Sequence, residues 1–303
     1  MAPAFIKFHG FGNDYIVIES EELAGFADLG EFARRICSRH YGAGADGIAV
    51  ISRENNEGAD LDVRIFNPDG SEAGLSGNGT RCAAAYVYYK KLWTRDELHL
   101  NTRSGIKRYF LVEQTDPGKF VFDSELGQPK FASGSIPMLT DGPMDRVVDY
   151  PLAVDGGLLS VTALQMGNPN CCIFVDDFEA IDWRHLGRAI ENHKQFPDRT
   201  NVVFVRVKDR RAVELRIWER GVGETTASGT CSCAAAVAAM IKGKTERSIV
   251  VLMPVGRARI QWLEDGEVGI NAPAELVYEG HWLASAQAKD MDDPRKTAKS
   301  LKR

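Results

Sequence analysis

Two halves of the chain carry the same short pattern, and this repeat limits the possible folds more than any other feature. Residues 63–77 (VRIFNPDGSEAGLSG) align with residues 215–229 (LRIWERGVGETTASG), so that Ser76 aligns with Ser228, 152 positions further on. Each copy has an apolar run typical of a strand, a Gly-rich turn and then a helical stretch of small residues. Because the offset is about half the chain, we expect two similar domains related by a pseudo-twofold axis.

The composition is that of a globular protein, with 44% hydrophobic and 26% charged residues. A length of 303 residues suits two domains of ~150 residues each. The formal net charge of −5 leaves no overall basic field, which argues against nucleic acid as the main partner. No apolar run reaches ~18 residues, so we expect neither a spanning helix nor a membrane partner.

The cysteines and the first residues indicate a reducing compartment. The start, MAPAFIKFHG, lacks the charged-then-apolar layout of a signal peptide. Six cysteines are too few for a disulfide scaffold in a chain of this length. We therefore expect a cytoplasmic protein with free thiols.

Short apolar runs alternate with helical stretches, which predicts a mixed α/β (α+β) fold. Helices are expected at residues 28–38, 79–90, 183–192 and 230–241. Strands are expected at residues 15–19, 47–52, 61–66, 119–122, 172–175, 202–207, 213–218, 248–253 and 258–262, and a last strand at about 275–283 should return to the first domain.

The Gly- and Pro-containing region 127–143 is where we expect the chain to cross between domains. The first domain is then residues 1–125 plus about 273–290, and the second is residues 126–272. A charged tail without apolar periodicity follows at 291–303.

The paired turns place a hydroxyl residue before each small-residue helix, at Ser76 and Ser228. A helix N-terminus presents unpaired N–H groups and a positive dipole end, so each can hold a carboxylate. Two such ends facing one small molecule suit proton removal on one face of a carbon and delivery on the other, which inverts a stereocentre. The alternative is that both serines are only N-caps, a position that serine often fills.

Seven short segments occur in the order found in one enzyme family, and with them the chain resembles diaminopimelate epimerase, a cofactor-independent amino-acid epimerase. They are residues 8–15 (FHGFGNDY), 42–47 (GAGADG), 67–72 (NPDGSE), 77–82 (GNGTRC), 167–169 (GNP), 196–201 (FPDRTN) and 219–225 (ERGVGET). The resemblance implies two α/β domains, each a curved, mostly antiparallel sheet around a central helix, with the active site in the cleft between them. It also implies catalysis without a cofactor, a small amino-acid substrate and a homodimer.

Roles for individual residues follow from the resemblance. Four asparagines would bind the amino and carboxyl ends of the substrate: Asn13, Asn67, Asn168 and Asn201. Backbone N–H groups would hold the carboxylate at the reacting carbon, from Gly77, Asn78, Gly229 and Thr230. Glu219 and Arg220 would contact the distal ammonium and carboxylate of a symmetric diamino diacid. A single asparagine in a Gly-rich stretch would more often serve the turn itself.

The chain departs from the family at the positions that carry the chemistry. The family uses one cysteine thiolate as base and one thiol as acid, whereas here these positions are Ser76 and Ser228. Asn170 stands where the family has histidine, and Cys231 stands where it usually has glycine. An alcohol ionises several units above a thiol, so serine is a poor base near neutral pH unless a neighbouring base activates it.

Three explanations for the serines stay open: a deliberate double Cys→Ser substitution, natural divergence, and a binding protein without catalysis. We favour divergence, because it covers all four changes together. Cys231 and Cys233 read as small buried helix residues rather than a nucleophile or a metal pair, since no second Cys/His cluster completes a metal site. No lysine stands in a context that suggests pyridoxal phosphate.

The predicted function is inversion of LL-diaminopimelate to meso-diaminopimelate, for lysine and peptidoglycan precursor synthesis. The alternatives are a related epimerase, an elimination on the same fold in which a β-hydroxyl leaves after α-proton removal, and an amino-acid binder.

Overall fold

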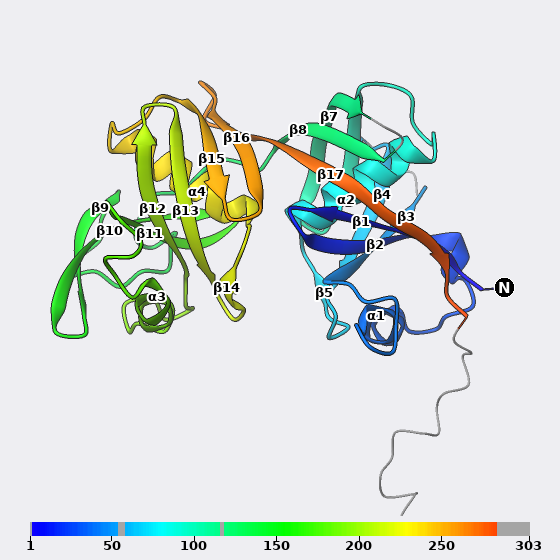
Figure 1. Cartoon of the computed structure of the whole chain (residues 1–303), viewed down its shortest axis with the longest axis horizontal. Coiled ribbons are helices and arrows are strands. Elements are labelled where there is room, and N and C mark those ends of the chain that lie inside the picture. Colours follow the sequence, from blue (N-terminus) through cyan, green and yellow to red (C-terminus); the bar gives the residue numbers. More distant parts are fainter. Residues whose placement is uncertain (1, 54–57, 116–117, 284–303) are drawn as a thin grey trace, which may run out of the picture.

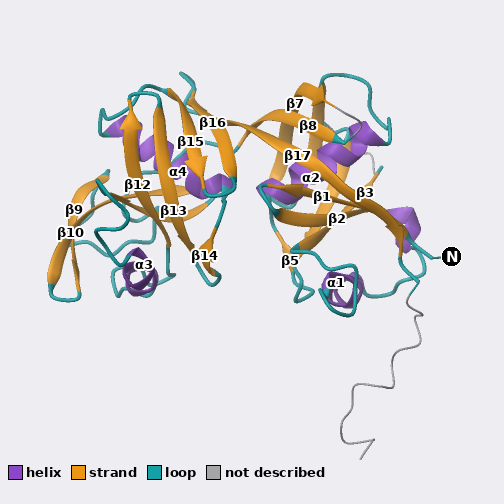
Figure 2. Cartoon of the chain, viewed as in Figure 1, coloured by secondary structure: helices purple, strands orange, loops and turns teal. Residues whose placement is uncertain are grey.

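The computed structural model describes residues 2–53, 58–115 and 118–283. Its elements form two bodies that lie side by side, each with sheet strands around one long helix (Figures 1 and 2). The predicted α+β class with two similar halves is therefore confirmed. None of the helices in these ranges is long and apolar enough to cross a membrane. The predicted tail at 291–303 lies outside the described residues.

The N-terminal half contains three helical segments, η1 (Ser20–Leu23), α1 (Leu29–Cys37) and α2 (Gly77–Tyr89). Its strands are β1 (Ala4–Gly10), β2 (Asn13–Glu19), β3 (Gly47–Ser52), β4 (Leu61–Phe66), β5 (Glu72–Ala73), β6 (Glu97–Thr102), β7 (Gly105–Thr115) and β8 (Lys119–Glu125).

The C-terminal half contains α3 (Trp183–Glu191) and α4 (Gly229–Ile241). Its strands are β9 (Val147–Val154), β10 (Gly157–Met166), β11 (Asn168–Phe174), β12 (Asn201–Asp209), β13 (Ala212–Glu219), β14 (Gly223–Thr225), β15 (Ser248–Met253) and β16 (Gly256–Trp262). The last strand of the fold is β17 (Val268–His281).

Strand pairing repeats from one half to the other. β2 pairs with β3 in parallel, as β11 does with β12, and β4 pairs with β6 in parallel, as β13 does with β15. The other neighbours in both halves are antiparallel, including β1 with β2 and β10 with β11. The same order of pairings in both halves accounts for the sequence repeat, and the sheets are mostly antiparallel as predicted.

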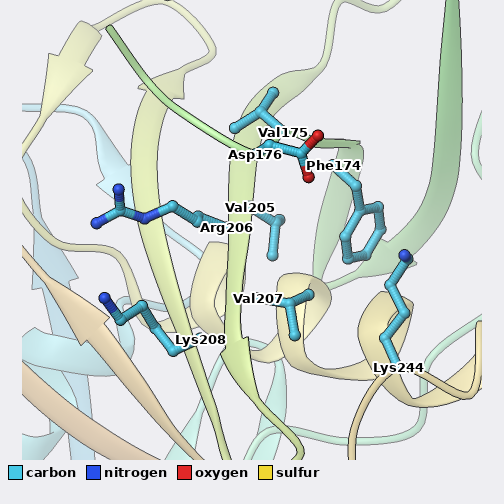
Figure 3. Close-up of a pocket in the computed structure, with 8 residues that line it drawn as sticks. All are labelled: Phe174, Val175, Asp176, Val205, Arg206, Val207, Lys208 and Lys244. Carbon is cyan, nitrogen blue, oxygen red and sulfur yellow. The ribbon is translucent and has the colours of Figure 1, made fainter.

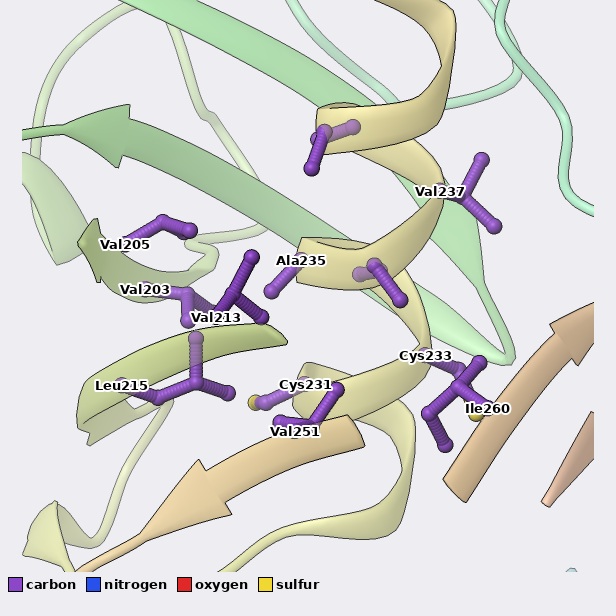
Figure 4. Close-up of a cluster of buried hydrophobic side chains, with 14 of the residues drawn as sticks. Val203, Val205, Val213, Leu215, Cys231, Cys233, Ala235, Val237, Val251 and Ile260 are labelled. Carbon is purple, nitrogen blue, oxygen red and sulfur yellow. The ribbon is translucent and has the colours of Figure 1, made fainter. Parts of the chain in front are cut away.

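The helices α2 and α4 are the centres of the two cores. Each is 13 residues long and apolar on nearly every side, which is the pattern of a helix enclosed by sheet. Figure 4 shows α4 surrounded by side chains from four strands, namely Val203, Val205, Val213, Leu215, Val251 and Ile260. Alanine and cysteine let the strands approach this closely, and a larger side chain there would cost about 1–3 kcal/mol through overpacking.

Both central helices begin earlier than the sequence pattern predicts. α2 starts at Gly77 instead of 79, and α4 starts at Gly229 instead of 230, because Ser76 and Ser228 stand directly before them in extended conformation. The sequence reading also omitted β1, β6, β7, β9 and β10, whose strands mix polar with apolar residues.

β17 belongs to both halves, as the view of Figure 1 shows. Ala272 packs in the core around α4 and Ala274 in the core around α2, so the strand changes core at Pro273. The predicted strand at 275–283 started too late, since the alternation of buried side chains begins at Val268. This packing supports the division into residues 1–125 with 273–290 and residues 126–272, which we keep as a proposal.

Candidate active site

A cavity of about 580 Å³ is lined by the first residues of both central helices. All but two of the predicted site residues line it, namely Asn13, Asn67, Ser76, Gly77, Asn78, Asn168, Glu219, Ser228, Gly229 and Thr230. The fold therefore brings Ser76 and Ser228, from opposite halves of the chain, to one cavity. This is the arrangement that inversion of a stereocentre requires.

Asn201 and Arg220 do not line this cavity. Asn201 is buried, donates to Asn170 Oδ1 over 3.2 Å and accepts the Arg220 backbone N–H over 2.9 Å. Arg220 is exposed and donates to the Asp198 carbonyl oxygen over 3.1 Å. In this arrangement both residues hold the 219–223 turn in place, and the substrate contacts predicted for them stay predictions.

The N-termini of α2 and α4 differ in the N–H groups that they leave for a ligand. Ser76 Oγ accepts the Gly79 N–H over 3.0 Å, whereas Ser228 makes no such capping bond. No described residue accepts the N–H groups of Gly77 and Asn78 on α2, or those at positions 229–231 on α4. Since free N–H groups at a helix N-terminus favour anions, both ends can hold a carboxylate.

Ser76 is joined to Tyr15, a residue that the sequence reading placed in a matching segment without a role. Ser76 Oγ donates to the Tyr15 hydroxyl over 2.9 Å, and Tyr15 also lines the cavity. Burial raises the pKa of Tyr15 above its usual value, although the bond to Ser76 opposes this. The hydroxyl pair therefore stays protonated near neutral pH and can give a proton more readily than take one.

Ser228 has a carboxylate as its neighbour. Burial raises the pKa of Glu219, and hydrogen bonds from Thr225 and Ser228 partly oppose the rise. Thr225 Oγ1 donates to Glu219 Oε1 over 2.8 Å, while Ser228 Oγ lies 3.5 Å from Thr230 Oγ1. A carboxylate with a raised pKa is better matched to proton abstraction than an ordinary one, so this side of the cavity can act as base.

Asn67 and Asn170 each combine a local role with their place beside the site. Asn67 lines the cavity but also donates to Ser71 Oγ over 2.9 Å, which is the turn chemistry considered above. Asn170 is fully buried, and its Nδ2 donates to the carbonyl oxygen of Asn168 over 2.7 Å and to Asn168 Oδ1 over 3.2 Å. Asn170 therefore orients Asn168 and does not line the cavity itself.

The six cysteines are all buried and free. Burial raises the pKa of Cys231 well above its usual value, and the nearby Glu219 carboxylate raises it further. Its thiol is therefore a poor base despite its place beside Ser228. In the part of the chain that the structure describes, no group of three or more His, Cys, Asp and Glu lies close enough to hold a metal ion.

Glu191 supports the Glu219 turn and was missed at the sequence level. Its carboxylate accepts from Trp218 Nε1 over 2.8 Å, from the Gly221 N–H over 2.7 Å and from Arg199 over 3.3 Å. These bonds fix the backbone on both sides of Glu219. The signal available in the sequence was a single acid at the end of an apolar helix face, which is too common to be decisive.

A second cavity of about 330 Å³ lies elsewhere on the C-terminal half (Figure 3). Aromatic, aliphatic and charged side chains line it, including Phe174, Val205, Arg206 and Lys244. Lys244 follows the C-terminal end of α4, roughly 20 Å along the helix from Ser228 at a rise of about 1.5 Å per residue. This second cavity contains none of the predicted site residues, so we take the cavity of about 580 Å³ as the candidate active site.

A model of the diaminopimelate epimerase family matches residues 5–131 and 162–277. The chain belongs to this family. A diaminopimelate epimerase from Pelotomaculum thermopropionicum is 39% identical over 279 residues, covering 92% of this chain and 98% of that protein. One from Desulfitobacterium hafniense is 40% identical over 283 residues, covering 93% and 98%.

Solved structures share the fold at low identity. Methylitaconate-delta-isomerase matches with a TM-score of 0.66 and 15% identity, over 96% of this chain and 99% of that chain. A predicted epimerase from Pseudomonas aeruginosa matches with a TM-score of 0.64 and 17% identity, over 94% and 100%. These likenesses agree with the two-halved fold around two central helices.

Proposed function

We propose that the protein is an isomerase that inverts the α-carbon of diaminopimelate, from the LL to the meso form. One observation carries this proposal: two helix N-termini from the two halves of a family member line one cavity, each with a hydroxyl at its start. The substrate identity comes from the names of the relatives. We also propose that it works in the cytoplasm, as a homodimer, in lysine and peptidoglycan precursor synthesis.

The first step in this proposal takes place on the Ser228 face. The Cα–H bond breaks, its proton passes to Ser228 Oγ as the Ser228 proton passes to Glu219, and the electron pair stays on Cα. The free N–H groups of α2 and α4 stabilise the charge that spreads into the substrate carboxylate. Glu219 can serve because its pKa is raised above its usual value.

The second step takes place on the Ser76 face. A new Cα–H bond forms with the Ser76 proton. The Tyr15 hydroxyl, which accepts from Ser76 before the reaction, then turns to donate a proton to Ser76 Oγ, and solvent reprotonates Tyr15. Glu219 then releases its proton to solvent, so the reaction changes configuration and no other bond. The high pKa of Tyr15 makes this the slower half of the reaction.

The proposal is tested by incubating the purified protein with LL-diaminopimelate in deuterated water. We expect meso-diaminopimelate with one deuterium at the inverted carbon, measured by chiral chromatography and mass spectrometry. A keto acid or an unsaturated product would show an elimination instead. Saturable binding without isotope exchange would show an amino-acid binder, and either result contradicts the proposed function.

A further inference from the structure

Arg81 is a buried cation behind the cavity that the proposed reaction does not use. It lies in the second turn of α2 and is only 2% exposed. Its Nε donates to the Pro273 carbonyl oxygen over 2.9 Å, and its guanidinium lies 5.7 Å from the centre of the Phe11 ring. Within the described ranges it has no carboxylate partner. Because a buried charge without an ion-pair partner is costly, its position calls for a role.

Arg81 starts a row of hydrogen bonds that passes through Asn78 and Asn13 and ends on Asp46, and these three residues all line the cavity. Arg81 Nη2 donates to Asn78 Oδ1. Asn78 Nδ2 then donates to Asn13 Oδ1 over 3.1 Å, and Asn13 Nδ2 donates to Asp46 Oδ2 over 2.8 Å. Arg39 holds the other oxygen of Asp46 over 2.6 Å.

The two charged ends permit only one orientation of the amides between them. A guanidinium can only donate, so Asn78 must turn its oxygen toward Arg81. A carboxylate can only accept, so Asn13 must turn its nitrogen toward Asp46. The remaining bond between Asn78 and Asn13 then runs from nitrogen to oxygen. Turning either amide over would place two donors or two acceptors together at both of its contacts.

This orientation determines what the two amides offer to a ligand. Asn13 and Asn78 both line the cavity, and each keeps one side-chain N–H that no described residue accepts. The free backbone N–H groups of Gly77 and Asn78 lie at the same helix end. Several unpaired donors at one place suit a carboxylate and disfavour an ammonium group.

We propose that Arg81 and Asp46 are positioning residues that lock the Asn13–Asn78 amide pair with its free donors available to the substrate carboxylate. The proposal deepens the proposed function and rests on it, since that function supplies the carboxylate. Neither positioning residue transfers a proton. Their effect falls on substrate binding and orientation more than on the chemical step.

The main test compares Arg81→Lys with Arg81→Met. Both variants lose the guanidinium fork that reaches Pro273, so packing and junction effects are shared between them. Only lysine keeps a cationic donor for Asn78 Oδ1. We expect KM to rise about tenfold or more in Arg81→Met with a smaller change in kcat, and Arg81→Lys to recover most of the loss. Equal KM values in the two variants would overturn the proposal.

The acid end supplies an independent test that spares the buried junction. Asp46→Asn replaces a group that can only accept with one that can donate or accept. The orientation of the Asn13 and Asn78 amides is then no longer fixed from this end. We expect a rise in KM, and we expect the Arg81→Met, Asp46→Asn double variant to be little worse than Arg81→Met alone. Fully additive effects would contradict coupling through the amides. Asp123→Asn is the matched control, because Asp123 accepts from Asn271 over 2.7 Å outside the cavity.

A measurement without substrate separates this proposal from the proposed function. Selective ¹⁵N labelling of asparagine reports hydrogen exchange at the side-chain amides of Asn13 and Asn78 in the free protein. We expect slow exchange in the parent and in Arg81→Lys, and faster exchange in Arg81→Met and Asp46→Asn. Unchanged exchange in the folded variants would refute the positioning role even if the parent is active. Protected amides in a parent without isomerase activity would refute the proposed function alone.

Discussion

Ser76 and Ser228 occupy equivalent places in the two halves, yet they have different partners. Ser76 caps α2 and bonds to the Tyr15 hydroxyl. Ser228 leaves α4 without a side-chain cap and lies beside the Glu219 carboxylate. The difference teaches that a repeated backbone can hold two chemically distinct hydroxyls. One side has a weak acid that stays protonated, and the other has a base.

The polar rows behind the two serines differ in the same way. In the N-terminal half, charged groups at Arg81 and Asp46 fix the asparagine amides. In the C-terminal half, backbone groups fix the asparagine amides. The Arg220 N–H donates to Asn201, and the Asn168 carbonyl oxygen accepts from Asn170. Ionised side chains therefore orient the asparagine amides of the N-terminal half, whereas backbone groups orient those of the C-terminal half.

The largest expected effect comes from restoring thiols at both serines. The cavity and both helix N-termini are already in place, and an alcohol ionises several units above a thiol. The Ser76→Cys, Ser228→Cys variant should gain roughly 10²- to 10⁴-fold in steady-state rate. Asn170 limits the gain, because the histidine of the family is still missing.

The single variants sharpen the comparison. Ser76→Cys should gain more than Ser228→Cys, since Glu219 already serves the Ser228 side. A double variant that binds substrate and folds but shows no gain would mean that these serines do not transfer protons.

Removing the base should produce the next largest effect. Glu219→Gln keeps the size of the side chain and loses the carboxylate, so the rate should fall about 10²-fold. The parent rate should rise with pH through a pKa above the usual glutamate value, since Glu219 must be ionised to accept a proton. The variant should lack this rise in its pH–rate profile. An acidic limb that persists in Glu219→Gln would assign the base to another group.

Acid stability tests the charge dependence of the N-terminal half. Burial acts to raise the pKa of Asp14, but hydrogen bonds from Arg39 and Lys7 outweigh it and lower the pKa from 3.8 to about 2. The stabilisation is on the order of 2 kcal/mol, is fully present above pH ~4 and is lost as the pH falls toward 2. Asp14→Asn should lack this acid-dependent loss in urea unfolding followed from pH 5 to pH 2. The same slope in the variant would exclude Asp14 as its source.

The smallest expected effect concerns the helix caps, and the two serines serve as each other's control. Ser76→Ala removes the bond to the Gly79 N–H and should lower the free energy of unfolding by about 1 kcal/mol. Ser228→Ala removes no capping bond but does remove the hydrogen bond to Glu219, so it is made in the Glu219→Gln background, where it should leave the free energy of unfolding nearly unchanged. Urea denaturation of both variants measures the difference. Equal losses would mean that the two helices are capped alike.

The sequence by itself determined the repeat, the fold class and the positions of the two helix N-termini to within two residues. The helix positions follow from local sequence, because a Gly-rich turn and then a run of small residues occur in each copy, and small residues let the strands approach the helix closely. The repeat led to Ser76 and Ser228, and the resemblance to the family led to the other predicted residues that line the cavity. Asn201 and Arg220 show that a place in a matching segment does not by itself bring a residue to the cavity, since both support a turn beside it.

Only the tertiary structure decided which group stands beside each serine. Tyr15 is 61 residues from Ser76 in the chain, and β17 changes core at Pro273, where Arg81 bonds. A strand's alternation shows which side chains face inward but does not show which distant residue they meet. These long-range contacts decide which side of the site is acidic and which is basic. Burial and neighbouring charge set a pKa, and neither can be predicted from the local sequence.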